Sequence, residues 1–209
     1  TIKVGNGTSL NNLSVGMLAT ENTIKLKNNG TISTGNNGIG IYGFDNIENK
    51  GSITTGNNGI AIYGKNNITS TGKIVTGNDS FGIYGIDNIT NKNNVTTGNN
   101  GVAIYGRNTI TSIGNLTAGN DGIGIYGGNT ITSTGNILTR NNGIGIYAKN
   151  NIISVGNISA GVNSFGLYGE NTITSTGNIT VGNDGVGIYG KNTITSNGNI
   201  TAGDKGIGI

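Results

Sequence analysis

Apolar and polar residues follow one another along this chain in a pattern that repeats every 21 residues. All eight tyrosines lie on that period, each 21 positions after the one before: Tyr42, Tyr63, Tyr84, Tyr105, Tyr126, Tyr147, Tyr168 and Tyr189. Self-similarity at a fixed period of about 20 to 50 residues is typical of solenoids and other repeat architectures. We therefore write the chain in rows of 21 that end at tyrosine, and call each position within a row a column.

Four columns hold only large apolar residues. They are the fifth (Leu26 to Ile194), the eleventh (Ile32 to Ile200), the eighteenth (Ile39 to Ile207) and the twentieth (Ile41 to Ile209). We expect all four to face the core. In the eighteenth column Phe81 is followed by Val102 one row later, and Phe165 by Val186, as packing at constant volume would require.

Each row is predicted to contain three short strands, such as 109–111, 115–117 and 123–126. Asparagine and glycine recur between them, and both tolerate the positive φ that a tight corner needs. A helix is not favoured, because β-branched residues alternate with polar ones and glycine recurs every few positions.

Three strands and three corners per row predict one coil of a parallel β-helix. A single coil buries too few side chains to offset the entropy of ordering it, so the coils must stack. The expected fold is all-β: one solenoid of about ten coils, regular over residues 22–209. Residues 1–21 depart from the pattern, with no tyrosine and with Leu10 and Leu13 off-column, and are expected to form an irregular initial coil.

Composition narrows the chemistry. The chain has 209 residues with no histidine, cysteine, proline or tryptophan, which excludes histidine or thiolate catalysis, disulfides and the usual zinc sites. Its net charge is +3 and the basic residues are scattered, so nucleic-acid binding is not expected. We expect no enzyme activity, cofactor or metal. The few carboxylates form no catalytic groove, although Asp45 and Asp87 share a column.

The tyrosines are the first candidate surface. They should form a stripe along one outer edge, since the isoleucine before each one is expected to point inward. The column before that isoleucine holds only glycine or alanine, which predicts a shallow groove beside the rings. Such a stripe could bind glycan or protein, or could simply stabilise the stack.

Charge in the second column gives a second candidate. Cations occupy it on alternate rows, at Lys65, Arg107, Lys149 and Lys191, which separates like charges that would otherwise be about 5 Å apart. Glu170 lies between the last two, so the sequence predicts an ion ladder of Lys149, Glu170 and Lys191.

Three further patterns suggest stacked asparagines, a calcium-binding turn and an ice-binding surface. Asparagines in the fifteenth column, such as Asn36 and Asn57, predict stacked side-chain amides. The turn 119–122 resembles a calcium-binding turn, but it occurs only once per coil. Pairs of threonines in register could form an ice-binding array: Thr109/Thr111, Thr130/Thr132, Thr172/Thr174 and Thr193/Thr195.

The block Gly122-Ile123-Gly124-Ile125-Tyr126-Gly127, followed by 129–137, resembles repeats in the very large autotransporter adhesins of fusobacteria, over roughly residues 22–209. The resemblance implies a right-handed β-helix that belongs to the passenger of a type V secreted protein. It also implies a C-terminal β-barrel, absent from this chain, as the only link to the outer membrane. Such passengers attach to host cells and other bacteria. No binding residues carry over, because the repeat is scaffold.

The sequence therefore predicts a non-enzymatic passenger segment of a cell-surface adhesin that acts mainly as a rigid stalk. Its expected partners are host-cell or bacterial receptors reached through the full-length protein, with end-to-end or self association of the rods as a further expectation. The alternative is a free-standing solenoid that binds ice or polysaccharide through its threonine or tyrosine face.

Overall fold

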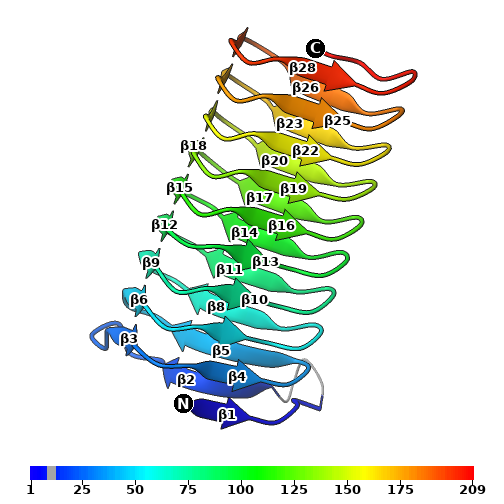
Figure 1. Ribbon diagram of the computed structural model, residues 1–209. Helices are drawn as coiled ribbons and strands as arrows, with labels where there is room; N and C mark the ends of the chain where they lie inside the picture. The colour runs from blue at the N-terminus through cyan, green and yellow to red at the C-terminus, as the bar shows by residue number, and fades with distance from the viewer. Residues whose placement is uncertain (9–12) are drawn as a thin grey trace.

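The computed structural model, described for residues 1–8 and 13–209, is a rod of stacked coils built from three parallel sheets (Figure 1). The described residues form 28 strands and no helix. Each regular coil inside the rod contributes one strand to each sheet, and each of these strands pairs with its counterparts in the coils before and after it. The predicted parallel β-helix with three short strands per coil is therefore confirmed, with about nine regular coils along the rod.

The sheets are named after their first strands. The β1 sheet contains β1 (Ile2–Val4), β4 (Ile32–Thr34), β7 (Ile53–Thr54), β10 (Ile74–Val75), β13 (Val95–Thr96), β16 (Leu116–Ala118), β19 (Ile137–Thr139), β22 (Ile158–Ala160), β25 (Ile179–Val181) and β28 (Ile200–Ala202). The β2 sheet contains β2 (Ser14–Ala19), β5 (Gly38–Gly43), β8 (Ile60–Gly64), β11 (Phe81–Gly85), β14 (Val102–Gly106), β17 (Ile123–Gly127), β20 (Ile144–Ala148), β23 (Phe165–Gly169) and β26 (Val186–Gly190). The β3 sheet contains β3 (Leu26–Asn28), β6 (Ile47–Asn49), β9 (Ile68–Ser70), β12 (Ile89–Asn91), β15 (Ile110–Ser112), β18 (Ile131–Ser133), β21 (Ile152–Ser154), β24 (Ile173–Ser175) and β27 (Ile194–Ser196).

The first coil stacks on the rod with a different spacing. Ile2 pairs with Ile32, 30 positions on, and Met17 pairs with Ile41, 24 positions on. From Leu26, which pairs with Ile47, the spacing is 21 in all three sheets. Leu13 is partly exposed, and Leu10 lies outside the described residues.

The core is a continuous column of aliphatic side chains along the rod axis. The fifth, eleventh and twentieth columns supply it, and members such as Ile53, Ile62 and Ile110 are wholly buried. Each coil covers the core of the one before it, which is why a coil that would be unstable alone is stable in the stack.

The eighteenth column was wrongly predicted to face the core. Apart from Ile39, its members are half-buried or exposed, and both Phe81 and Phe165 lie at the surface. The nineteenth column points inward instead: Ala61 and Ala103 are fully buried, and a Cβ on Gly82 would lie 2.3 Å from a methyl carbon of Val95. Its residues are small because they pack against the eleventh column, so the predicted groove beside the rings is filled by the core.

The corners use positive φ differently from the prediction. Asparagine or aspartate in the sixteenth column adopts it in eight coils and lysine in the last: Asn37, Asn58, Asp79, Asn100, Asp121, Asn142, Asn163, Asp184 and Lys205. No described glycine has positive φ. Glycine recurs for lack of space: a Cβ at Gly72 would lie 1.8 Å from the carbonyl oxygen of Gly51 in the preceding coil.

One buried column contains hydroxyls without partners. In the thirteenth column the Oγ1 atoms of Thr34, Thr55, Thr76, Thr97 and Thr139 form no hydrogen bond, whereas the other regular coils place alanine or Val181 there. Thr76→Val removes such a hydroxyl at nearly constant volume. Because an unsatisfied buried polar group costs about 1–3 kcal/mol, we expect the free energy of unfolding to rise by about 1 kcal/mol. Chemical denaturation should show this gain, and Thr96→Val, on the outer face, should not reproduce it.

Candidate functional site

The eight tyrosines form one continuous aromatic stack along the outside of the β2 sheet. Ring centroids of successive tyrosines lie between 4.5 Å (Tyr84–Tyr105) and 5.2 Å (Tyr63–Tyr84) apart, and the largest angle between ring planes is 22°. Each ring is half-buried except Tyr189, which is exposed. Since the faces of the rings are occupied by one another, the stack presents ring edges and hydroxyls to a ligand.

The two phenylalanines of the eighteenth column, Phe81 and Phe165, pack against this stack. Phe81 meets Tyr84 edge-on at 5.4 Å between centroids and Tyr105 at 6.1 Å, and Phe165 meets Tyr168 at 5.7 Å. Edge-to-face contacts of this kind are favourable between aromatic rings. The phenylalanines therefore belong to the tyrosine surface, whereas the sequence pattern had placed them in the core.

The cations of the second column run beside the hydroxyl edge of the tyrosines. Lys65 lies over the ring of Phe44, with 3.5 Å between Nζ and the ring centroid. Hydrogen bonding to the hydroxyls of Tyr105 and Tyr84 raises the pKa of Arg107.

The candidate ion ladder forms at one of its two steps. The Nζ of Lys191 lies 3.2 Å from a carboxylate oxygen of Glu170. The other oxygen of Glu170 accepts a hydrogen bond of 2.9 Å from the hydroxyl of Tyr147. These two hydrogen bonds hold the pKa of Glu170 below its usual value, and Lys149 lowers it further through its charge.

Tyr147 should make the rod sensitive to high pH. Burial, and then its hydrogen bond to Glu170, raise the pKa of Tyr147 to about 12, against about 10 for an unperturbed tyrosine. Because the pKa is higher in the folded state, this contribution to stability is complete below about pH 10 and is lost as the pH rises toward about 12. The tyrosinate absorbance should be measured against pH for the wild type and for Tyr147→Phe. The difference between the two curves should show one phenol that ionises near pH 12. Ionisation of that phenol near pH 10 would contradict the assignment, and Glu170→Gln should shift it to lower pH.

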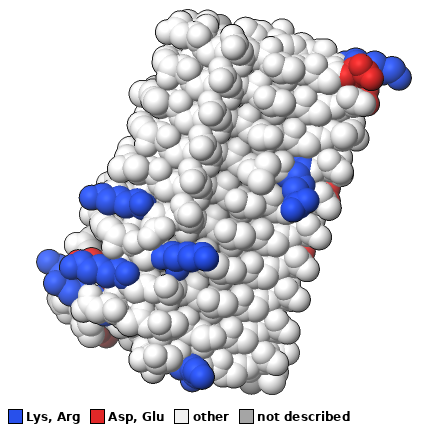
Figure 2. Space-filling view, viewed as in Figure 1, with Lys and Arg blue, Asp and Glu red and all other residues white. Residues whose placement is uncertain are grey.

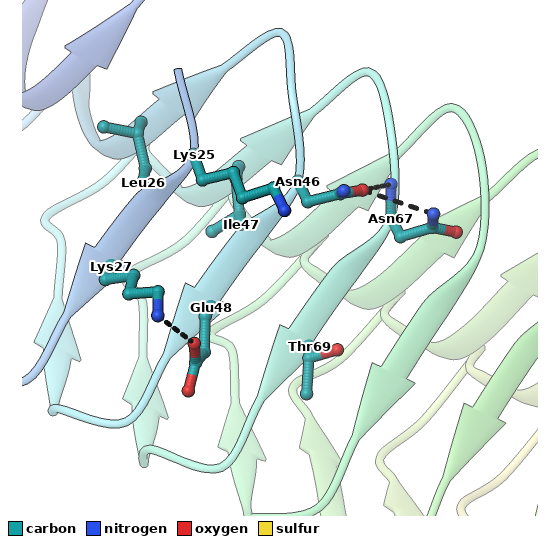
Figure 3. A pocket seen from close by; sticks show the side chains of 8 residues that line it. All are labelled: Lys25, Leu26, Lys27, Asn46, Ile47, Glu48, Asn67 and Thr69. Carbon is teal, nitrogen blue, oxygen red and sulfur yellow. Dashed lines mark hydrogen bonds and ion pairs between the residues drawn. The ribbon is translucent and has the colours of Figure 1, made fainter. Parts of the chain in front are cut away.

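A second charged surface lies on the β3 sheet near the beginning of the rod. A shallow hollow of about 410 Å³ lies here, and Thr69 is among the residues that line it (Figure 3). Lys25 lies just before β3 and Lys27 within it, and Glu48 lies on the neighbouring β6; all three line the hollow. Glu48 offsets part of the positive charge of this patch, because its oxygens lie 3.4 Å from Nζ of Lys27 and 2.8 Å from Nζ of Lys50. The lysine hydrogen bonds and charges lower the pKa of Glu48, led by Lys50.

Much of the face seen in Figure 2 is uncharged, and the basic side chains in that view gather mostly toward the N-terminal half. The threonine pairs lie on and beside the β3 sheet. Thr90 pairs in register with Thr69 and Thr111, and Thr111 with Thr132, each partly exposed. Ile153 interrupts this row.

Asparagine ladders run along the corners, but not all as predicted. In the fifteenth column it is the backbone N–H of Asn57 that donates to Oδ1 of Asn36, at 2.8 Å, and the same contact repeats in the following coils. The tenth column does the same from Asn115 onward. Side-chain amides do bond to one another in the third column, as between Asn150 and Asn129 at 3.0 Å.

A buried polar ladder in the seventh column went unpredicted. Asn28 donates to Asn49 at 2.8 Å, and Asn49 donates to the hydroxyl of Ser70 at 3.1 Å. The signal was present in the sequence, because every row carries asparagine or serine there. It marks the inner side of a corner, where a short polar side chain can satisfy its neighbour.

The acidic residues are dispersed. Asp45 and Asp87 accept from the amides of Asn66, at 3.4 Å, and Asn108, at 3.0 Å, in the following coils. Over residues 1–8 and 13–209 no group of three or more acidic, histidine or cysteine side chains is placed to hold a metal ion. The same residues include no helix long and apolar enough to span a membrane.

Comparison with known proteins gives no match, whether to a protein family, a curated protein or a solved structure. The geometry of the chain itself therefore carries the functional argument that follows.

Proposed function

We propose that this chain is a non-enzymatic segment of the passenger of a bacterial cell-surface adhesin, in which it acts mainly as a rigid stalk. The observation that carries the proposal is the unbroken spacing of 21 residues from Leu26 to the last coil in all three sheets. A fold built in this way extends in one direction only, by about 4.8 Å for each coil.

Several features suit a spacer. The core runs through all coils, and hydrogen-bonded ladders of asparagine backbone and side chains join successive corners. The tyrosine stack adds aromatic contacts between successive coils on the outside of the rod. Each of these contacts links one coil to the next, so together they resist bending and twisting between coils. The absence of cysteine is compatible with passage through an oxidising compartment, where disulfides would otherwise form.

Surface exposure is the first test of this proposal. Antibodies raised against the purified chain should label intact cells of the bacterium that makes it, and external protease should remove the label. An antibody against a periplasmic protein, which should label only permeabilised cells, is the control. Labelling that requires permeabilisation of the cells would contradict a surface location.

The row of in-register threonines on the β3 sheet favours a second candidate, binding to ice as a repetitive surface. A thermal-hysteresis measurement on the purified rod tests it, with Thr90→Lys and Thr111→Lys as variants. Absence of thermal hysteresis in the wild type would remove this candidate without affecting the stalk proposal.

A further inference from the structure

The second column alternates between a cation and another residue along the tyrosine edge. The residues between the cations differ in what they offer: Phe44, Ile86, Gly128 and Glu170. Phe44 lies under Lys65, and Glu170 pairs with Lys191. Between Arg107 and Lys149 the chain provides only Gly128, which has no side chain.

A hollow of about 400 Å³ lies at this position, lined by Tyr105, Gly106, Arg107, Tyr126, Gly128 and Lys149. A Cβ at Gly128 would lie 2.5 Å from the backbone oxygen of Arg107, so a side chain at this position could not fill the hollow without moving backbone. In the described part of the chain neither cation forms an ion pair. The carboxylate of Asp87, on the preceding coil, is bonded to Asn108.

The repeat itself shows what fits there. Two coils further along, Glu170 places a carboxylate in the equivalent position, between Lys149 and Lys191. That carboxylate accepts from the hydroxyl of Tyr147 at 2.9 Å and lies 3.2 Å from Nζ of Lys191. Two coils earlier, which is 42 positions, Tyr105 corresponds to Tyr147. Arg107 there corresponds to Lys149, and Lys149 to Lys191. The hollow thus offers the same donors to a carboxylate that the chain does not supply.

We propose that the hollow at Gly128 binds the carboxylate of an acidic sugar, held between Arg107 and Lys149 and hydrogen-bonded by the hydroxyl of Tyr105. That hydroxyl can accept from the guanidinium of Arg107 and still donate its own proton to the ligand. Charge-assisted hydrogen bonds from two cations and a phenol are strong and directional.

The shape of the site favours a sugar over an acidic peptide. Acidic peptide motifs are typically bound by clusters of arginines, and other peptides by strand addition to a free sheet edge or by an apolar groove. Here β14 is paired on both sides, with β11 and β17, and the hollow is lined by two tyrosines, two glycines, one lysine and a single arginine. Its volume lies within the range of small-ligand sites.

Titration of the ¹⁵N-labelled chain with a glucuronate-containing hexasaccharide at low salt tests the proposal. The amide signals of Gly128 and its neighbours should shift, and a neutral glucan hexasaccharide should leave them unchanged. Arg107→Gln and Lys149→Gln should each weaken binding about tenfold, as loss of one charge-assisted bond worth about 1.4 kcal/mol implies. Lys73→Gln, which removes the same charge elsewhere on the rod, should have no effect.

Glu170→Gly provides a gain-of-function arm. It empties the equivalent position between Lys149 and Lys191, so a second set of shifts should appear around position 170. The proposal fails if the acidic hexasaccharide does not shift Gly128, or if both glutamine variants bind as well as the wild type. Tighter binding of a hexaglutamate peptide would overturn the assignment to a sugar. All arms use the purified chain, so their outcome is independent of the surface-labelling test.

Discussion

Deletion of residues 106–147, which are two whole coils, should give a shorter rod that still unfolds in a single transition. The new junction joins Tyr105 to Ala148, and every column then continues in register. In the second column Lys149 takes the place of Arg107 after Ile86, so the alternation of cations is preserved. Stability in a solenoid is close to a sum of coil and interface terms, and this deletion removes both without creating a mismatched interface.

Deletion of residues 106–136 should have a far larger effect, although fewer residues are lost. It joins Tyr105 to Ile137 and removes the β3-sheet strand from the junction, so the chain cannot close a coil there. The exposed coil interface uncovers about three aliphatic side chains, one from each core column, at roughly 1.5–3 kcal/mol each. We therefore expect the free energy of unfolding to fall by about 5–9 kcal/mol and unfolding to occur in two steps. Far-UV circular dichroism against denaturant compares the two deletions, and equal stabilities would contradict the stacking argument.

Gly156→Val should be among the most damaging single substitutions. A Cβ there would lie 2.1 Å from the carbonyl oxygen of Gly135 and 2.5 Å from its carbonyl carbon. These are backbone atoms of the preceding coil, so the backbone of one coil must shift to relieve the overlap. Overpacking in a well-packed site costs typically 1–3 kcal/mol and sometimes more, and we expect about 3 kcal/mol from denaturant unfolding.

Gly5→Val is the matched control for this substitution, because a Cβ at Gly5 has no atom within 4 Å. It should change stability by no more than about 0.5 kcal/mol. A similar loss in both variants would mean that valine acts through the conformational preferences of the chain. The proposed collision between coils would then be wrong.

The fold was predictable because the same pattern of apolar, polar and glycine positions recurs in nine successive rows. One row leaves helix, strand and loop open, but Ile53, Ile74 and the other members of the eleventh column can only be explained by stacking. Three strands per coil, the parallel sheets and the outward tyrosines followed from that alignment. Right-handed coiling rests on the family resemblance and stays a prediction.

The wrong predictions concern the direction in which a side chain points, which its position in a column does not determine. Phe81 was assigned to the core because it is large and apolar, yet the strand turns its side chain outward onto Tyr84, while Gly82 and Ile83 face inward. Strict alternation would have placed Phe81 and Ile83 on one face. Two successive inward residues interrupt that alternation, and nothing in the apolar pattern marks the interruption.

The candidate site was only partly predictable for a related reason. The sequence placed Lys149, Glu170 and Lys191 in one column, but side-chain direction decided that Glu170 bonds Lys191 and the hydroxyl of Tyr147. Likewise, asparagines in the fifteenth column were expected to bond amide to amide, but the corner geometry presents a backbone N–H to each Oδ1. Column alignment therefore identifies neighbours, whereas donors and acceptors follow from the local backbone.

The hydrogen bonds between coils lie along the rod axis, and this determines how the rod responds to tension. Pulling on its two ends loads the coil interfaces in series, so each interface carries the full force however long the rod is. Within residues 1–8 and 13–21, the first coil has strands in two of the three sheets, and these strands, β1 and β2, pair with the next coil through spacings of 30 and 24 residues. This coil also carries no tyrosine. We expect this interface to yield first, so that the regular coils remain closed while the irregular one absorbs the initial extension.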